Sequence, residues 1–233
     1  MRAPVSPAGW IAAAGLAFAA LAALAAPARA QALIADLSSH LIAITTGFAG
    51  TEILLFGATE GEGGVVVVVR GPETTATVRR KARVGGIWIN RDQVSFTGVP
   101  TFYRVAASGP LAELAPAALR QRHQIGLDQL RLNAERALDP AEEREFRDGL
   151  MRNKERRELF SSEVGRVSFL GPRLFRTRLV LPANVPTGSY TVEVFLIRDA
   201  QVIAAQSTPL IVSKIGIAAD VFEFAHRQAA LYG

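Results

Sequence analysis

Apolar and polar residues alternate along two stretches of the chain, which flank a segment with a different pattern. Residues 31–104 have a period of two, are rich in β-branched side chains and are interrupted at short intervals by Gly, Pro and Asp, and the alternation returns from residue 167. This pattern is typical of antiparallel sheets, because successive side chains of a strand point to opposite faces. The predicted strands are 41–45, 51–58, 65–70, 74–83, 87–93, 102–107, 167–170, 175–181, 188–198 and 202–213.

One predicted strand differs from the others, because residues 65–69 are consecutive valines. A run without alternation indicates that both faces of the strand are covered, so we expect it at the centre of a sandwich. The preceding Gly61-Glu62-Gly63-Gly64 segment predicts a hairpin turn, since glycine tolerates the positive φ that such turns require.

The next predicted strand carries a cluster of cations, formed by Arg79, Arg80, Lys81 and Arg83. Consecutive residues of a strand point to opposite faces, so these four side chains cannot all be buried. One hypothesis is a charged edge strand that discourages pairing between molecules. The other is a contact for an acidic partner or for anionic lipid head groups at a membrane surface.

The segment at about 110–163 is rich in Ala, Leu, Arg and Glu and predicts a helical insertion. A helix is expected to begin at Asp139, because its carboxylate can accept hydrogen bonds from free backbone N–H groups. Pro140 suits the first turn, and Glu142 lies where a capping box places a carboxylate. A shorter helix is predicted at 116–124.

The longer predicted helix has only a narrow apolar stripe, formed by Phe146, Leu150 and Met151. We therefore expect it on the surface of the domain rather than through its core. The final residues, 215–233, predict a second amphipathic helix, and their end in Leu-Tyr-Gly after Arg227 is typical of a segment next to a membrane.

These patterns together predict a mainly β protein. The expected fold is an immunoglobulin-like antiparallel β-sandwich over residues 31–214, with the helical insertion and a C-terminal amphipathic helix. The immunoglobulin-like assignment depends on Pro186, Gly188 and Tyr190. Such sandwiches often begin a strand with a buried tyrosine whose hydroxyl binds nearby backbone.

Residues 1–30 have the three parts of a secretory signal peptide. Arg2 gives a positive start, residues 11–26 are an uncharged apolar run, and Ala28-Arg29-Ala30 offers a small-x-small cleavage site. An uncleaved N-terminal helix is the alternative, although the run is shorter than the roughly 18–20 apolar residues that cross a bilayer. We expect cleavage and export, which predicts a periplasmic protein.

The net charge argues against one class of partner, and the cysteine content excludes disulfides and one kind of membrane anchor. Without the signal peptide, 24 basic residues stand against 21 acidic ones. This small excess is spread along the chain and forms no basic stripe, so nucleic acid is not an expected partner. The sequence contains no cysteine, which excludes disulfides and a lipid-anchored N-terminal cysteine.

The sequence indicates no catalytic residue, no metal ligands and no cofactor. Its three histidines, His40, His123 and His226, are far apart and do not have the spacing of zinc ligands. The acidic residues of 139–158 alternate with Arg and Lys, as on a solvated helix face. We therefore expect a protein that is not an enzyme. An enzyme of unrecognised type, with catalytic groups scattered along the chain, is an alternative.

Several colinear blocks carry a resemblance to a known family. They are LSSHLIAITTGF (37–48), LLFGA (54–58), VVVVRGP (66–72), GIWIN (86–90), RHQIG (122–126), FR (175–176), PANVPTG (182–188) and FAHRQ (224–228). Together they resemble the alphaproteobacterial putative transmembrane protein family over essentially all of residues 31–233. This resemblance carries over no catalytic or binding residues.

The resemblance implies a periplasmic domain held at the inner membrane. Family members look like signal-peptide proteins with one transmembrane helix after the position of Gly233, so an anchor is expected in a C-terminal helix missing from this chain. Members are often encoded beside sulfite-exporter-type transporters, which implies an inner-membrane protein as partner.

Three functional hypotheses follow. The leading one is a non-enzymatic periplasmic accessory or interaction module for an inner-membrane partner, with the cations of 79–83 as a candidate contact. The second is a periplasmic small-anion-binding protein that uses the same cations, or Arg91 and Arg104. The third is the enzyme of unrecognised type.

Overall fold

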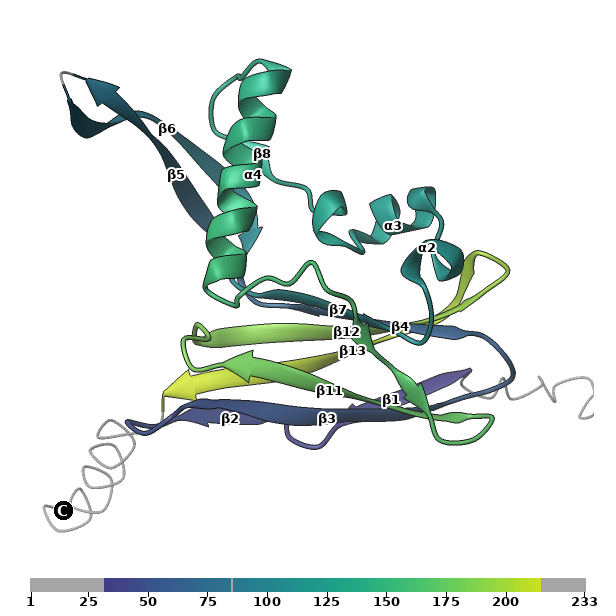
Figure 1. The fold of residues 1–233 in the computed structure, drawn as a ribbon. Coiled ribbons are helices and arrows are strands. Elements are labelled where there is room, and N and C mark those ends of the chain that lie inside the picture. The colour runs from purple at the N-terminus through teal and green to yellow at the C-terminus, as the bar shows by residue number, and fades with distance from the viewer. Residues whose placement is uncertain (1–31, 85, 215–233) are drawn as a thin grey trace, which may run out of the picture. The chain divides into compact units, whose positions relative to one another are not determined.

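The computed structural model describes residues 32–84 and 86–214 (Figure 1). The predicted signal peptide at 1–30 and the predicted helix at 215–233 lie outside the described residues. The described chain is mainly β with three sheets. Its strands are β1 (Leu33–Leu37), β2 (Leu41–Ile44), β3 (Gly50–Thr59), β4 (Gly64–Arg70), β5 (Glu73–Val84), β6 (Ile87–Pro100), β7 (Tyr103–Ala107), β8 (Asn133–Ala134), β9 (Gly165–Arg166), β10 (Ser168–Phe169), β11 (Leu174–Pro182), β12 (Gly188–Arg198) and β13 (Gln201–Lys214).

The first sheet has four strands in the order β1-β3-β11-β10, and all of its pairs are antiparallel. Leu33, Ala35 and Leu37 of β1 alternate with exposed residues and are buried. The inward side of this sheet lies against the second, larger sheet (Figure 1). Strand β1 was missed by the sequence prediction, although it has the alternation of a half-buried strand.

The second sheet has six strands in the order β2-β13-β12-β4-β7-β9. The expected purely antiparallel arrangement is wrong here, because β2 pairs with β13 and β9 pairs with β7 in parallel. Period-two alternation is the same in both kinds of pair, so it does not reveal strand direction. Both parallel pairs lie at the sheet edges and join segments far apart in the sequence.

The valine run forms the centre of the six-stranded sheet, as predicted. Strand β4 lies between β12 and β7, and the exposed fraction of Val65–Val69 is at most 2%. Complete burial of a valine side chain contributes about 1.5–3 kcal/mol to folding. This strand is therefore a main element of the core.

The predicted hairpin between β3 and β4 is not formed. Gly61 and Gly63 have the expected positive φ, 83° and 157°. However, β3 pairs with β1 and β11, whereas β4 pairs with β12 and β7 in the other sheet. Glycine permits the chain to turn here, but burial of strand faces determines which strands pair.

The predicted strand at 167–170 is formed only in part, because the structure has one short strand within it, β10, and another just before it, β9. Strand β9 pairs with β7 of the six-stranded sheet, whereas β10 pairs with β11 of the four-stranded sheet. Val167 lies between them and is 2% exposed. The apolar pattern here therefore marks a buried crossing between sheets rather than one strand.

The third sheet has the order β5-β6-β8, so the cation-rich β5 is an edge strand. The hypothesis of a charged edge strand that discourages pairing between molecules requires this position. Helix α4 (Pro140–Arg156) packs along β5 (Figure 1). Its buried residues are Phe146 and Leu150, which confirms the narrow apolar stripe. The helix therefore lies on the surface of the domain and covers one face of this sheet.

The helical elements lie between β7 and β9, within the expected segment. They are α2 (Leu111–Leu114), α3 (Ala117–His123), a 3₁₀ turn (Leu127–Gln129) and α4. The predicted start of α4 is confirmed, because the Asp139 carboxylate accepts hydrogen bonds from the N–H groups of Ala141 and Glu142, at 2.8 and 2.9 Å. The Glu142 carboxylate pairs with Arg136 at 2.7 Å.

The predicted buried tyrosine is confirmed at the start of β12. Tyr190 is fully buried, and its hydroxyl donates to the carbonyl of Pro186 at 2.5 Å. Burial raises the pKa of this hydroxyl to about 12. The bond ties the turn at 182–188 to the strand that follows it.

One side chain joins the edges of the two large sheets. The Gln206 amide on β13 donates to the carbonyl of Ala35 on β1 at 2.6 Å and accepts from its N–H at 2.8 Å. A strand's backbone would offer the same donor and acceptor. Gln206 therefore extends the β1 ladder toward the six-stranded sheet.

Candidate functional site: an uncovered sheet face

The outward side of the four-stranded sheet carries large apolar side chains that no other described element covers. Ile34, Phe56 and Leu174 are 56%, 45% and 56% exposed. Leu170, which directly follows β10, is 51% exposed, and Val180 on β11 is 46% exposed. We call this surface the outer face; its residues are Ile34, Asp36, Glu52, Leu54, Phe56, Ala58, Leu170, Leu174, Arg176, Arg178 and Val180.

Strand register arranges the outer face in rows. Asp36, Phe56 and Arg176 are partners across β1, β3 and β11, so an aromatic ring lies between an acid and a base. The neighbouring row is wholly apolar and consists of Ile34, Ala58 and Leu174. We call Ile34, Phe56 and Leu174 the apolar strip. The carboxylate of Asp36 lies on one side of its aromatic ring and the guanidinium of Arg176 on the other.

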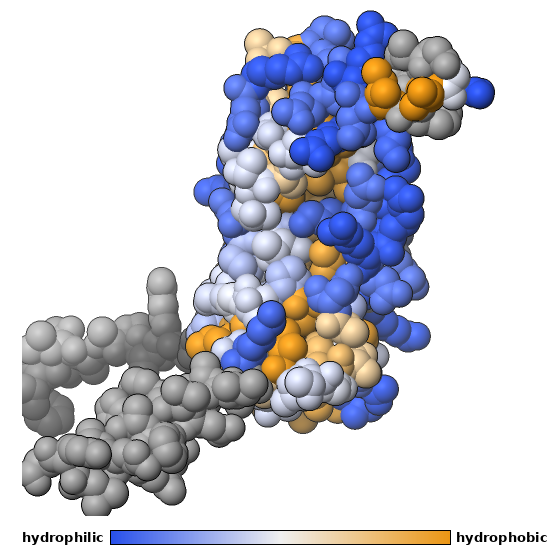
Figure 2. All heavy atoms as spheres, turned by 90° about the vertical axis from the view of Figure 1, so that its left-hand side faces the viewer, coloured by the Kyte–Doolittle hydropathy of each residue, from blue (hydrophilic) through white to orange (hydrophobic). Residues whose placement is uncertain are grey.

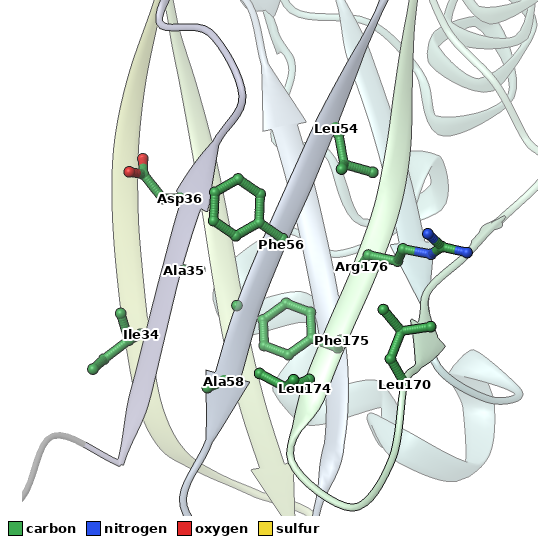
Figure 3. Close-up of a pocket in the computed structure, with 11 residues that line it drawn as sticks. Ile34, Ala35, Asp36, Leu54, Phe56, Ala58, Leu170, Leu174, Phe175 and Arg176 are labelled. Atoms are coloured by element: carbon green, nitrogen blue, oxygen red, sulfur yellow. The ribbon is translucent and has the colours of Figure 1, made fainter.

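A groove of about 400 Å³ follows these rows (Figure 3). Its lining is almost entirely apolar, with Ile34 and Phe56 on one side and Leu170 and Leu174 on the other. The carboxylate of Asp36 lies at its edge and pairs with His40 at 2.9 Å. A groove of this composition suits burial of apolar side chains from a partner rather than binding of a polar solute.

Further along the strands, charged residues border the apolar strip. Arg178 pairs with Glu52 across β11 and β3 at 3.2 Å, and both side chains are largely exposed. An apolar centre with a charged border is the usual composition of a protein–protein contact surface.

The cations predicted as a contact on β5 do not converge on one point. Arg79, Lys81 and Arg83 share one face of the strand, whereas Arg80 is on the opposite face, toward α4. The guanidinium of Arg80 pairs with Asp92 and Glu145 at 2.7 and 2.8 Å.

The other three cations have neutral partners or none within the described residues. Arg79 donates to the Gln93 side chain at 3.4 Å, and Arg83 donates to the carbonyl of Gly86 at 3.3 Å. Arg91 is on the neighbouring β6. Arg104 is on β7, in a different sheet, and donates to the carbonyl of Glu158.

A partly buried polar network, which sequence reasoning missed, joins the helical segment to the six-stranded sheet. The guanidinium of Arg70 pairs with Glu193 and donates to the carbonyls of His123 and Gln124, at 2.5 and 3.2 Å. Burial lowers the pKa of Arg70. The hydroxyl of Tyr103 donates to the same Gln124 carbonyl at 2.7 Å.

The network donates hydrogen bonds to the carbonyl groups of His123 and Gln124 at the C-terminal end of α3. The backbone of Gln124 is left-handed there, with φ 51°. Arg70, His123 and Gln124 lie in two of the blocks that carry the family resemblance, 66–72 and 122–126, whereas Tyr103 and Glu193 lie outside the blocks. The shared blocks were the only signal in the sequence for this network. The groups contact one another, although Arg70 Nε is buried without a hydrogen-bond partner in the described part of the chain. Within the part of the chain that the structure describes, no three His, Asp or Glu side chains gather as metal ligands.

Comparison with known proteins identifies the family. The family described as Putative transmembrane protein (Alph_Pro_TM) matches residues 32–233. The chain belongs to this family. The Alph_Pro_TM match includes the outer face, the β5–β6 hairpin and the helical segment. No curated protein and no solved structure gave a match. Among residues 32–84 and 86–214, no helix has the length and apolar character needed to cross a membrane.

Proposed function

We propose that this Alph_Pro_TM protein is a non-enzymatic periplasmic interaction module that binds an inner-membrane protein through its outer face. The observation that carries this proposal is the apolar strip of Ile34, Phe56 and Leu174, which is about half exposed at each position. Contiguous exposed apolar surface on a folded domain is typical of a site of association.

The arrangement of charges supports a specific rather than a general contact. Asp36 and Arg176 lie on opposite sides of Phe56 in one row. A partner that places a cation opposite Asp36 and an anion opposite Arg176 would be favoured. If the same partner bound in the reversed orientation, like charges would face each other. The central aromatic side chain is of the type that often contributes most to binding.

The family name and the expected export support the proposal of an inner-membrane partner. A transporter of the sulfite-exporter type is our first candidate. We also propose that the two large facing sheets form an immunoglobulin-like sandwich. The Tyr190–Pro186 hydrogen bond supports this assignment.

The test is affinity purification of the tagged chain from detergent-solubilised membranes of its native cells. We expect an integral membrane protein to be recovered with the wild type. The double variant Phe56→Gln/Leu174→Gln should bind at least about 30-fold more weakly, because the loss of one central interface side chain alone costs about 2 kcal/mol.

The matched control is Ile203→Gln/Ile211→Gln on β13. These residues are 47% and 50% exposed, like those of the outer face, but belong to the other sheet. The control should recover the partner as the wild type does. Recovery of no membrane protein, or equal loss in both double variants, would contradict the proposal, as would binding of only a second copy of the chain.

A further inference from the structure

The β5–β6 hairpin has an inner half covered by α4 and an outer half that extends beyond this cover (Figure 1). In the inner half, Val78, Val94 and Phe96 are 7%, 1% and 0% exposed. Arg80 marks the end of the covered part, because its guanidinium lies 5.3 Å from the Phe146 ring centre and pairs with Glu145 of α4. We call residues 81–84 and 86–91 the hairpin tip.

Large apolar residues continue beyond this limit. Ile89 and Ile87 pair with residues 82 and 84 of β5, so they share a face with Arg80, Val94 and Phe96. Unlike those residues, they are 45% and 69% exposed. Figure 2 shows apolar atoms at this end of the molecule, next to hydrophilic ones.

A register shift places the isoleucines on this face. Arg80 pairs with Asp92, but the next residue, Lys81, pairs with Asn90, which leaves Arg91 without an opposite residue. Without this bulge, Asn90 rather than Ile89 would face the same side as Arg80, because side chains alternate along a strand. The bulge therefore makes the tip amphipathic.

The opposite face of the hairpin is cationic. Arg79, Lys81 and Arg83 alternate along β5 and are exposed. The sequence from residue 74 to residue 91 contains five basic residues and no acidic one. Of the five, only Arg80 has a carboxylate within ion-pair distance in the described part of the chain. The hairpin tip thus combines exposed isoleucines with uncompensated positive charge.

We propose that the hairpin tip binds the surface of an anionic lipid bilayer, with Ile87 and Ile89 at the boundary between head groups and acyl chains and Lys81 and Arg83 on lipid phosphates. This goes beyond the proposed function, because it requires no protein partner. A bilayer fits better than an acidic protein, since a narrow ribbon end cannot supply the roughly 800 Å² per partner of a stable protein interface. Apolar insertion beside cations is how interfacial segments bind anionic membranes.

The first experiment places a reporter at the tip. The chain has no cysteine, so Ile87→Cys accepts a single environment-sensitive fluorophore. With vesicles of phosphatidylglycerol and phosphatidylcholine (1:3), its emission should shift to shorter wavelength, and pure phosphatidylcholine should give no shift. The control, Ser207→Cys, labels an exposed position on β13 and should not respond. This comparison separates tip insertion from membrane binding by other parts of the chain.

The second experiment measures vesicle affinity by cosedimentation. Lys81→Gln/Arg83→Gln should weaken binding to the anionic vesicles about 25-fold, because each cation near an anionic membrane increases the affinity about fivefold. Ile87→Asn/Ile89→Asn should also lose binding, whereas Arg176→Gln/Arg178→Gln, with the same loss of charge on the outer face, should not. Circular dichroism checks that each variant is folded.

Three results would overturn the proposal. The first is that anionic vesicles leave the emission of the fluorophore at position 87 unchanged. The second is that both tip variants bind the anionic vesicles as tightly as the wild type does. The third is that the Arg176→Gln/Arg178→Gln control loses as much vesicle affinity as the tip variants. Binding to polyglutamate without any binding to vesicles would instead indicate an acidic protein partner and would also contradict it.

Discussion

At the scale of the residue, Gly57 lies in the middle of β3, where a glycine weakens a strand unless the space is needed. Its register partner on β11 is Phe175, which is 1% exposed. A Cβ on Gly57 would lie 2.5 Å from Cζ of Phe175 and 2.4 Å from the carbonyl oxygen of Ile34. The missing side chain therefore lets Phe175 pack directly beneath the outer face.

We expect Gly57→Ala to destabilise the protein by about 1–3 kcal/mol, because the backbone oxygen of Ile34 cannot move away without breaking the β1–β3 ladder. Thermal unfolding measures this as a decrease in midpoint of about 2–4 °C per kcal/mol. Gly47→Ala is the control, since a Cβ there has no neighbour within 4 Å. Equal midpoints for wild type and Gly57→Ala would show that Phe175 can repack.

At the scale of the element, α4 combines a start specified locally with contacts specified by the fold. Asp139 caps its first turn, as the sequence predicts. Arg147, which has the spacing of an i,i+4 pair with Glu143, instead donates to the carbonyl of Leu130 at 2.6 Å. Arg147 thus binds a carbonyl of the preceding loop rather than a carboxylate of its own helix.

The cap of α4 makes stability depend on pH in the acid range. Hydrogen bonds from the N–H groups of Glu142 and Ala141 hold the pKa of Asp139 below its ordinary value of 3.8. The folded pKa is lower than the unfolded one, so this stabilisation is complete above the unfolded pKa and is lost as pH falls through the folded pKa.

We therefore expect Asp139→Asn to reduce the loss of stability below about pH 4 while changing little at pH 7, because Asn also caps helices well. Urea unfolding midpoints between pH 2 and pH 7 test this expectation. Parallel pH profiles for wild type and variant would show that other carboxyl groups determine the acid response.

At the scale of the whole molecule, residues 171 positions apart join the two large sheets through Gln206 and Ala35. Strand β1 pairs only with β3, so its other side depends on this amide. Sheet edges require such covering, because their unpaired N–H and C=O groups can otherwise pair with other chains.

Gln206→Ala should destabilise the protein by about 1–3 kcal/mol, because it removes the hydrogen-bond partners of two partly buried backbone groups, the N–H and the C=O of Ala35. Hydrogen exchange should increase at the Ala35 N–H before it increases in β4. Gln206→Glu keeps an acceptor for that N–H but loses the donor, so its Ala35 exchange should lie closer to the wild type. Unchanged exchange at Ala35 in Gln206→Ala would contradict this role.

Much of the secondary structure could be predicted, because its signals are local. The valine run, the Asp139 cap and the Tyr190–Pro186 hydrogen bond each depend on residues close together in the sequence. The outer face could not be predicted. Ile34 and Phe56 have the alternation of ordinary half-buried strands, and only the packing of the sheets shows that their side faces outward. The cations of 79–83 were found and expected on two faces, but only the structure shows that Arg80 is on the face toward α4.

The sequence by itself determined that this is a mainly β protein with a helical segment, a covered central strand and a cation-rich strand, since hydrophobic period and capping are properties of neighbouring residues. Only the tertiary structure decided which strands pair, which pairs are parallel and which apolar faces stay uncovered. The physical reason is that a strand's pattern shows that one side is apolar but not which element, if any, will cover it. The outer face and the hairpin tip are both apolar sides of this kind, left without cover by the described fold.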